Sequence, residues 1–258
     1  MKINYYGTKT KNTKIKFGFF TRQGGLSLNN FSSLNCSYNS GDQKKLVKQN
    51  IKIALKNIKL NDKFLKLPYQ THSNKVVIIN KYNLKQKIIA DGLITQDRNI
   101  NLGILTADCC PIFIYDKDET FICCLHSGWK GTYKNIIKNA LNKINKIQPD
   151  KKKIKAAIGP CLNKKNFEVK NNFKKKFLDK DKENKAFFYN RLKKNNWFFD
   201  MRGLIKYQLL NNNITQIENF NLDTYSNENL FFSHRRSTHF DDLPAGRMIN
   251  VIGFARKT

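Results

Sequence analysis

The feature that most constrains the fold is the interleaving of strand-like and helix-like runs along the chain. The strand-like runs are short and rich in Val, Ile and Phe, as extended segments tend to be. They span residues 16–20, 75–80, 102–107, 111–116, 120–126, 154–159 and 248–254. The helix-like runs span residues 43–58, 132–147, 170–178 and 202–212. This interleaving predicts the α/β or α+β class with a mixed sheet.

The length of 258 residues suits one large domain or two small ones, and no internal repeat or long linker divides the chain. No run approaches the roughly 18 consecutive apolar residues of a membrane span. The first residues hold no apolar block of signal-peptide length, so we expect a cytoplasmic protein without a membrane partner. The six cysteines are then expected to be free thiols, because the cytosol is reducing.

The net charge of +29 raises the question of nucleic-acid binding, because clustered Lys and Arg neutralise phosphates. Lys, Asn and Ile are abundant throughout, however, and no basic-aromatic nucleic-acid motif accompanies the lysines. This pattern favours a compositional bias, and a nucleic-acid partner is not expected. The lysine-rich segment 180–196 is interpreted as a surface excursion.

The sequence around residues 106–129 predicts a metal site. Two strand-like runs flank a polar turn, so the segment is interpreted as a β-hairpin centred between Lys117 and Asp118. Cys109 and His126 lie equally far from that centre. Symmetric pairing would place their Cβ atoms about 4.5–5.5 Å apart, close enough to share an ion.

A third ligand is needed, and the chain has four histidines. His72 lies in a loop that leads into a strand. Two imidazoles and one thiolate suit zinc, and three protein ligands leave a position open for substrate or water. The same donors also suit copper. The alternative interpretation is a buried, hydrogen-bonded histidine with structural thiols.

Phosphate-binding candidates follow the hairpin. The turn 127–132 opens a helix, where backbone N–H groups attract anions, and Lys130 adds charge. The alternative is a plain helix start with Thr132 as its cap. Arg22, Arg235, Arg236 and Arg247 are candidates because a guanidinium binds phosphate through two hydrogen bonds. Their alternative is surface ion pairing.

These motifs together resemble the YfiH-type family, long labelled multicopper polyphenol oxidases or laccase-domain proteins. The resemblance runs from Phe17 to Gly253. It rests on FTRQGGLS (20–27), SLNCS (33–37), GD (41–42), QTHSNKV (70–76), ADGLIT (90–95), TADCCP (106–111), HSGWKGT (126–132), AAIGPCL (156–162), FEV (167–169), FFSHRR (231–236) and GR (246–247). Ser127, Lys130, His234 and the pair Asp223-Thr224 depart from the usual family pattern.

The resemblance implies a single domain over residues 1–258, with layered mixed β-sheets covered by helices. It also implies zinc held by His72, Cys109 and His126. The implied activity is that of a purine nucleoside phosphorylase. It would act on adenosine, inosine, guanosine or methylthioadenosine with phosphate, with adenosine deaminase as a side activity.

Site roles are expected as follows. Arg22, Lys130, Arg235 and Arg236 would face phosphate, with Arg247 as a further substrate-binding residue. Asp91 or Asp108 would hydrogen-bond or protonate the purine, unless both only cap turns.

Three rival functions stay open. One is a cysteine hydrolase, including a cell-wall amidase, with Cys109 as nucleophile and His126 as base. Another is a copper-dependent phenol oxidase, although four histidines are too few for multicopper clusters. The third is an RNA-binding protein. The oligomeric state is not predicted.

Overall fold

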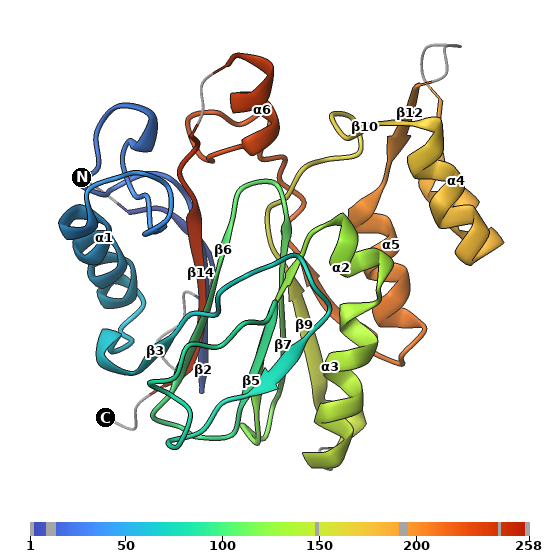
Figure 1. The fold of residues 1–258 in the computed structure, drawn as a ribbon. Coiled ribbons are helices and arrows are strands. Elements are labelled where there is room, and N and C mark those ends of the chain that lie inside the picture. Colours follow the sequence, from blue (N-terminus) through green and yellow to red (C-terminus); the bar gives the residue numbers. More distant parts are fainter. Residues whose placement is uncertain (1–2, 9–13, 148–149, 191–195, 242–243, 256–258) are drawn as a thin grey trace.

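Two β-sheets pack face to face, with helices outside both, in the computed structural model (Figure 1). The structure describes residues 3–8, 14–147, 150–190, 196–241 and 244–255. The first sheet has the strand order β1 (Tyr5–Gly7), β2 (Ile15–Phe20), β14 (Met248–Phe254), β6 (Asn101–Thr106) and β3 (Leu65–Lys66). The second has the order β13 (Gln216–Asn219), β9 (Ile154–Ile158), β7 (Cys110–Asp116), β8 (Ile122–Ser127), β5 (Gly92–Thr95) and β4 (Val76–Ile78).

Both sheets are mixed. The pairs β3·β6, β4·β5 and β9·β13 are parallel, and the remaining pairs are antiparallel. The predicted class and the layered arrangement are therefore confirmed. That residues 1–258 form one domain remains a prediction.

The core between the two sheets is rich in aromatic side chains. Side chains of a strand alternate between its two faces, so every second residue of a strand points into this core. Phe19 of β2 stacks on Phe113 of β7 with ring centroids 4.6 Å apart. Ile112 and Ile114, the neighbours of Phe113, belong to the cluster on the opposite face of the second sheet. Because both faces of β7 are buried, its sequence is a nearly continuous run of apolar residues.

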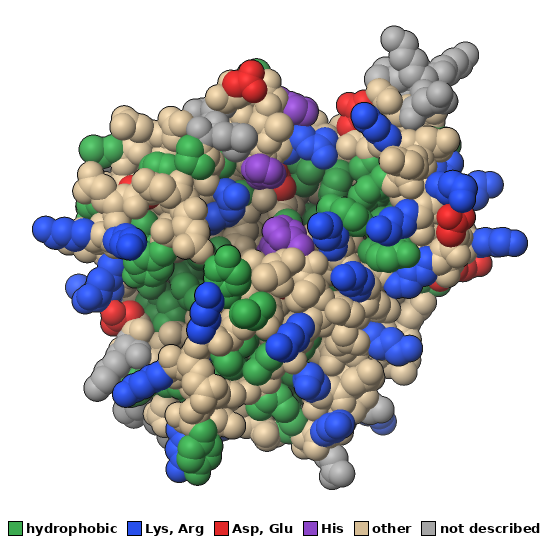
Figure 2. All heavy atoms as spheres, viewed as in Figure 1, with side chains coloured by type: hydrophobic (Ala, Val, Ile, Leu, Met, Phe, Trp, Pro, Cys, Tyr) green, Lys and Arg blue, Asp and Glu red, His purple; other side chains and the backbone are tan. Residues whose placement is uncertain are grey.

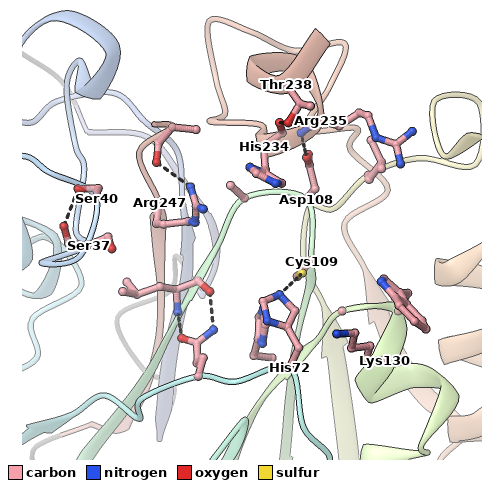
Figure 3. A pocket seen from close by; sticks show the side chains of 18 of the residues that line it. Ser37, Ser40, His72, Asp108, Cys109, Lys130, His234, Arg235, Thr238 and Arg247 are labelled. Carbon is pink, nitrogen blue, oxygen red and sulfur yellow. Dashed lines mark hydrogen bonds between the residues drawn. The ribbon is translucent and has the colours of Figure 1, made fainter. Parts of the chain in front are cut away.

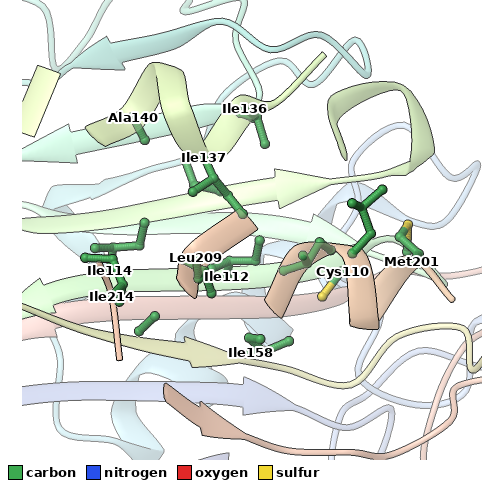
Figure 4. Packing of buried hydrophobic residues seen from close by; sticks show 14 of the residues in the cluster. Cys110, Ile112, Ile114, Ile136, Ile137, Ala140, Ile158, Met201, Leu209 and Ile214 are labelled. Carbon is green, nitrogen blue, oxygen red and sulfur yellow. The ribbon is translucent and has the colours of Figure 1, made fainter. Parts of the chain in front are cut away.

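Helices cover the outer faces of the two sheets. α1 (Lys44–Asn57) packs against the first sheet. α3 (Ile136–Ile144) and α5 (Met201–Leu210) place Ile136, Ile137 and Leu209 against the second sheet (Figure 4). Short 3-10 turns occupy Asn29–Phe31, Asp62–Phe64, Asn145–Ile147 and Lys151–Lys153.

The predicted helix over 132–147 is interrupted. α2 (Trp129–Tyr133) begins before it, and Asn135 then adopts a left-handed conformation with φ 55° before α3 starts. The Asn135 side chain accepts a hydrogen bond from the Lys138 N–H and so caps α3. Asn tolerates this conformation better than other residues with a Cβ, which explains a break that periodicity did not show.

The described part of 180–196 is mostly exposed, as expected of a surface segment, but it also forms secondary structure that the sequence did not predict. After α4 (Asn171–Lys180) come a 3-10 segment (Lys182–Phe187) and β11 (Phe188–Tyr189). β11 pairs with β12 (Asn196–Phe199), which pairs with β10 (Glu168–Lys170) in a small third sheet. Phe188 stacks on Phe199 with ring centroids 4.9 Å apart, and this aromatic contact anchors the lysine-rich segment to the small sheet. Residues 191–195 lie outside the described residues.

The six cysteines are all free thiols, as expected. No helix in the described part of the chain has both the length and the apolar character needed to cross a membrane.

Candidate metal centre and active site

A cavity of about 800 Å³ opens at one end of the two sheets. Its walls come from the loops before β4, β7 and β14, the β8–α2 junction, and the start of α6 (His234–His239). Figure 2 shows histidines in and around a hollow on this face, with basic side chains nearby. Segments far apart in the sequence therefore build one site.

His72, Cys109 and His126 converge in this cavity (Figure 3). One potential ligand atom from each lies within 4.8 Å of the other two. The Cys109 Sγ is 3.7 Å from the His72 Nε2, and the two imidazole centroids are 4.9 Å apart. The predicted ligand set is thus a group that could hold a metal ion.

The hairpin register that led to this prediction is wrong by two residues, because the centre of the turn lies one residue further along the chain. His126 pairs with Pro111, and Ser127 pairs with Cys110. The turn is displaced because the Asp116 carboxylate accepts hydrogen bonds from the Thr120 N–H at 2.8 Å and the Thr120 hydroxyl at 2.7 Å. The loop is then centred between Asp118 and Glu119.

Cys109 accordingly lies just before β7, in line with Gly128 across the hairpin. A Cβ at position 128 would be 2.9 Å from the Cys109 Sγ and 3.1 Å from the His72 Cδ2. Only glycine leaves room for the thiol and the imidazole to meet here. The prediction of convergence is right, although its geometric reason is not.

Asp91 holds both histidines in place. The His126 Nδ1 lies 2.8 Å from the Asp91 Oδ1, and the His72 backbone N–H donates to the same oxygen at 3.0 Å. The Ser73 N–H and hydroxyl donate to the other oxygen at 2.6 and 2.7 Å. A carboxylate that fixes the second ring nitrogen of a histidine is the usual support of a metal ligand, and it leaves the His126 Nε2 for an ion.

Charges in this group are strongly coupled. Burial raises the pKa of Asp91, but hydrogen bonds from His126 and Ser73 outweigh it and hold the pKa well below its usual range. Burial also raises the pKa of the Cys109 thiol, whereas His126 and His72 lower it to about 6. Burial lowers the pKa of His126, while Cys109 and Asp91 raise it to about 9. Without a metal, these shifts favour a thiolate at Cys109 and a protonated imidazole at His126.

Asp108 organises the opposite wall of the cavity. It accepts hydrogen bonds from the Thr224 hydroxyl at 2.6 Å, the Ser233 hydroxyl at 3.0 Å and the Arg235 N–H at 2.6 Å. These contacts tie the start of α6 to the residue before Cys109. Asp91 and Asp108 both act as acceptors, and the fully buried Asp91 does not line the cavity.

Three of the predicted phosphate-binding residues line the cavity: Lys130, Arg235 and Arg247. The Arg235 Nη1 donates to the backbone oxygen of Glu168 at 3.2 Å, which directs its guanidinium along the cavity edge. Among the described residues, Asp108 is the only acidic side chain in the lining. The excess of positive charge suits an anionic substrate.

Arg22 and Arg236 lie elsewhere and do not line the cavity. The Arg236 guanidinium is buried and donates to the backbone oxygens of Thr224, Tyr225 and Phe231. The Arg22 Nε donates to the Ser32 backbone oxygen at 2.6 Å, and its guanidinium lies 4.4 Å from the Phe232 ring centroid. Both arginines brace loops around the cavity, a role that sequence alone does not separate from phosphate binding.

The structure also corrects the role of Thr132 and adds residues to the site. α2 begins at Trp129, so Thr132 is not its cap; its hydroxyl donates to the Gly128 oxygen at 3.0 Å. His234, Ser37 and Phe167 line the cavity, although we assigned them no role from the sequence. Their motifs, FFSHRR, SLNCS and FEV, were the available signal.

Two packed mixed sheets with a His–Cys–His group at their end define a candidate metal-binding enzyme. Residues 16–255 match the profile of the family described as multi-copper polyphenol oxidoreductase laccase, and the chain belongs to this family.

The chain is also similar to several individual proteins, among them two named purine nucleoside phosphorylases. A purine nucleoside phosphorylase of Rickettsia prowazekii is 36% identical over 174 residues, which cover 66% of this chain and 70% of the relative. Another, of Bacteroides thetaiotaomicron, is 28% identical over 96% of this chain and 94% of the relative. The crystal structure of the hypothetical protein YfiH from Bacillus licheniformis matches with a TM-score of 0.85 at 27% identity, over 93% of each chain.

Proposed function

We propose that this protein is a zinc-dependent purine nucleoside phosphorylase. It would convert adenosine, inosine, guanosine or methylthioadenosine and phosphate into the free base and the corresponding ribose 1-phosphate. The observation that carries the proposal is the His–Cys–His group at the wall of a cation-lined cavity. Relatives named purine nucleoside phosphorylases support the substrate class. A cytoplasmic location remains a prediction.

The donor set fits zinc. It offers two imidazoles and a thiol whose pKa is lowered to about 6, which favours the thiolate that zinc binds. Asp91 fixes the orientation of His126. Copper accepts the same donors, so the choice of zinc is part of the proposal. A zinc ion bound here would supply Lewis acidity for polarising a bound group.

The side chains of this protein would bind and position the reactants. In phosphorolysis a phosphate oxygen forms a bond to the anomeric carbon, the bond from that carbon to the base breaks, and its electron pair leaves with the base, which takes up a proton. Lys130 and Arg235 would hold the phosphate beside the anomeric carbon, because both line the cavity and carry positive charge. Positioning and fixed charge supply much of the rate enhancement in such reactions.

The test is chromatography of the free base released from inosine or adenosine by the zinc-loaded protein. We expect release that requires phosphate, together with formation of ribose 1-phosphate. Base release that is absent, or independent of phosphate, contradicts the proposal. Arg98→Ala is the control, since Arg98 pairs with Glu119 on the surface, away from the cavity.

We also propose adenosine deamination as a side activity at the same site, in which a water oxygen bonds to C6 of the purine, the bond from C6 to the amino nitrogen breaks, and ammonia leaves. The expected result is slow conversion of adenosine to inosine and ammonia without phosphate. This activity should disappear together with phosphorolysis in Cys109→Ala. Deamination that persists in that variant would assign it to another site or a contaminant.

One observation favours a second candidate, a cysteine hydrolase. Cys109 lies 3.7 Å from the His72 Nε2, and its pKa is lowered to about 6. A thiolate beside an imidazole is the arrangement of a nucleophile. Metal-free protein that hydrolyses an amide and is inactivated by iodoacetamide would favour this candidate over the phosphorylase.

A further inference from the structure

The cavity has a second polar wall that the proposed phosphorylase reaction does not use. Ser37, Ser40 and Arg247 line it. In Figure 3 this wall lies on one side of His72 and Cys109, while Lys130 and Arg235 lie on the other. The cavity therefore carries positive charge at two separate places.

This wall is held together by Asn35. The Asn35 Oδ1 accepts hydrogen bonds from the backbone N–H of Ser37 at 3.1 Å and of Arg247 at 2.9 Å. The Cys36 N–H donates to the Arg247 backbone oxygen at 3.1 Å. Ser37 and Arg247, 210 positions apart in the sequence, are thus fixed beside each other.

The Arg247 guanidinium on this wall is held in a fixed orientation, yet some of the hydrogen-bond donors of Arg247 and Ser37 are available to a ligand. The Arg247 Nη1 donates to the backbone oxygens of Ala245 at 2.6 Å and Gly246 at 3.0 Å, which holds the guanidinium in place. Within the described residues, the Arg247 Nε and Nη2 and the Ser37 hydroxyl have no hydrogen-bond partner. Ser37 is only 8% exposed, so its hydroxyl meets the cavity rather than open solvent. A guanidinium and a hydroxyl side by side suit a phosphate monoester.

We propose that Arg247 and Ser37 form a subsite for the 5′-phosphate of a purine nucleoside 5′-monophosphate. This inference rests on the proposed function and narrows its substrate class. In a purine nucleoside, the attacking phosphate approaches the ribose face opposite the base, whereas the 5′ carbon projects from the same face as the base. The two anionic groups then need cations on opposite walls, as found here. The volume of about 800 Å³ lies near the upper end of the ~300–1,000 Å³ range of ligand pockets.

The reaction balances with phosphate as the only co-reactant. A phosphate oxygen bonds to the anomeric carbon, the carbon–nitrogen bond to the base breaks, and the base leaves with the electron pair and takes up a proton. The 5′-phosphate is unchanged, so the sugar product is ribose 1,5-bisphosphate.

The experiment compares inosine with inosine 5′-monophosphate in two ways. The first is the ratio of their kcat/KM values with zinc-loaded protein and phosphate. The second is the ratio of their dissociation constants, measured by calorimetry without phosphate. We expect the monophosphate to be favoured at least about tenfold in both, the effect of one charge-assisted hydrogen bond.

Variants separate the two walls. Arg247→Ala should bring both ratios close to one, and Ser37→Ala should lower them several-fold. Lys130→Ala removes a cation from the other wall and should lower turnover of both substrates while leaving their ratio as it was.

The inference is overturned if the monophosphate binds no tighter than inosine, or if the ratio survives in Arg247→Ala. It is also overturned if Arg247→Ala mainly raises the KM for inorganic phosphate, which would place the attacking phosphate at this wall. If neither substrate is cleaved, the proposed function fails, and the calorimetric ratio still decides for or against the subsite.

Discussion

Asp91 is the residue on which both histidines of the candidate metal centre depend. Its two oxygens receive the His126 ring nitrogen, the His72 N–H and the Ser73 N–H and hydroxyl. One buried carboxylate therefore sets the orientation of a ring and the path of a loop. A carboxylate in this role affects the metal without touching it.

Replacing Asp91 with Asn should lower the affinity for zinc by about 10–100-fold, because the amide gives His126 weaker support and its NH2 group leaves at least two of the surrounding donors without an acceptor. Competition with a chromophoric chelator measures this affinity. Asp179→Asn is the matched control, since Asp179 is exposed and pairs with Lys175 on the surface of α4. Equal affinities in the two variants would show that Asp91 does not support the site.

Zinc affinity should rise with pH. Binding needs a thiolate and neutral imidazoles. Between about pH 6, the pKa of Cys109, and about pH 9, the pKa of His126, loss of the His126 proton should raise the affinity about tenfold per pH unit. Below about pH 6 the thiol is protonated as well and the slope should steepen. Isothermal titration in buffers of different ionisation enthalpy counts the released protons, and a pH-independent affinity would contradict the assigned charges.

At the residue scale, the sequence identifies the candidate metal-ligating side chains better than it identifies the residues that surround and orient them. His72, Cys109 and His126 could be named because few histidines exist and their chemistry is distinctive. The roles of Asp91 and Arg236 could not be predicted, because a carboxylate or guanidinium may serve the fold or the substrate, and only the folded neighbours decide.

Among the elements, the α2–α3 break positions the site most directly. α2 begins at Trp129, two residues after the end of β8, and the turn at Asn135 lets α3 run back along the outer face of the sheet (Figure 1). Periodicity predicted the helical residues of this segment but not the break, because the regularly spaced apolar residues, from Ile136 to Ile144, all lie after Asn135. The hairpin register failed for a similar reason: the Asp116–Thr120 contacts that set it are side-chain details.

Asn135→Ala should destabilise the protein by about 2–3 kcal/mol, because it removes the cap of α3 and places a Cβ in a left-handed conformation. Asn135→Gly should cost less than about 1 kcal/mol, since glycine accepts the conformation and is a fair cap. Urea unfolding gives both free energies. Equal losses in the two variants would mean that backbone conformation at this position does not limit stability.

Across the whole molecule, the two sheets are joined by an aromatic layer that includes Phe17, Phe19 and Phe113. The sequence predicted the strands and the class, but not which strands are neighbours, because pairing between distant strands depends on the complete packing. The residues that line the cavity could not be predicted as a group for the same reason. Its wall residues range from Ser37 to Arg247, and only the assembled sheets bring them together.

Phe113→Ala should lower the free energy of unfolding by about 3–5 kcal/mol, because the side chain is fully buried between the sheets and stacks on Phe19. Phe240→Ala is the matched control, since Phe240 is 71% exposed. Urea denaturation compares them. Similar stabilities in both variants would contradict the account of a core between the sheets.

We propose above that His72, Cys109 and His126 together bind one zinc ion. The most direct test of this proposal is the metal content per chain, by inductively coupled plasma mass spectrometry, of the protein and of Cys109→Ala after identical purification and zinc loading. We expect one zinc per chain in the protein and almost none in the variant, with folding checked by circular dichroism. A folded Cys109→Ala that retains a full equivalent of zinc, or a protein that binds none, would contradict the proposal.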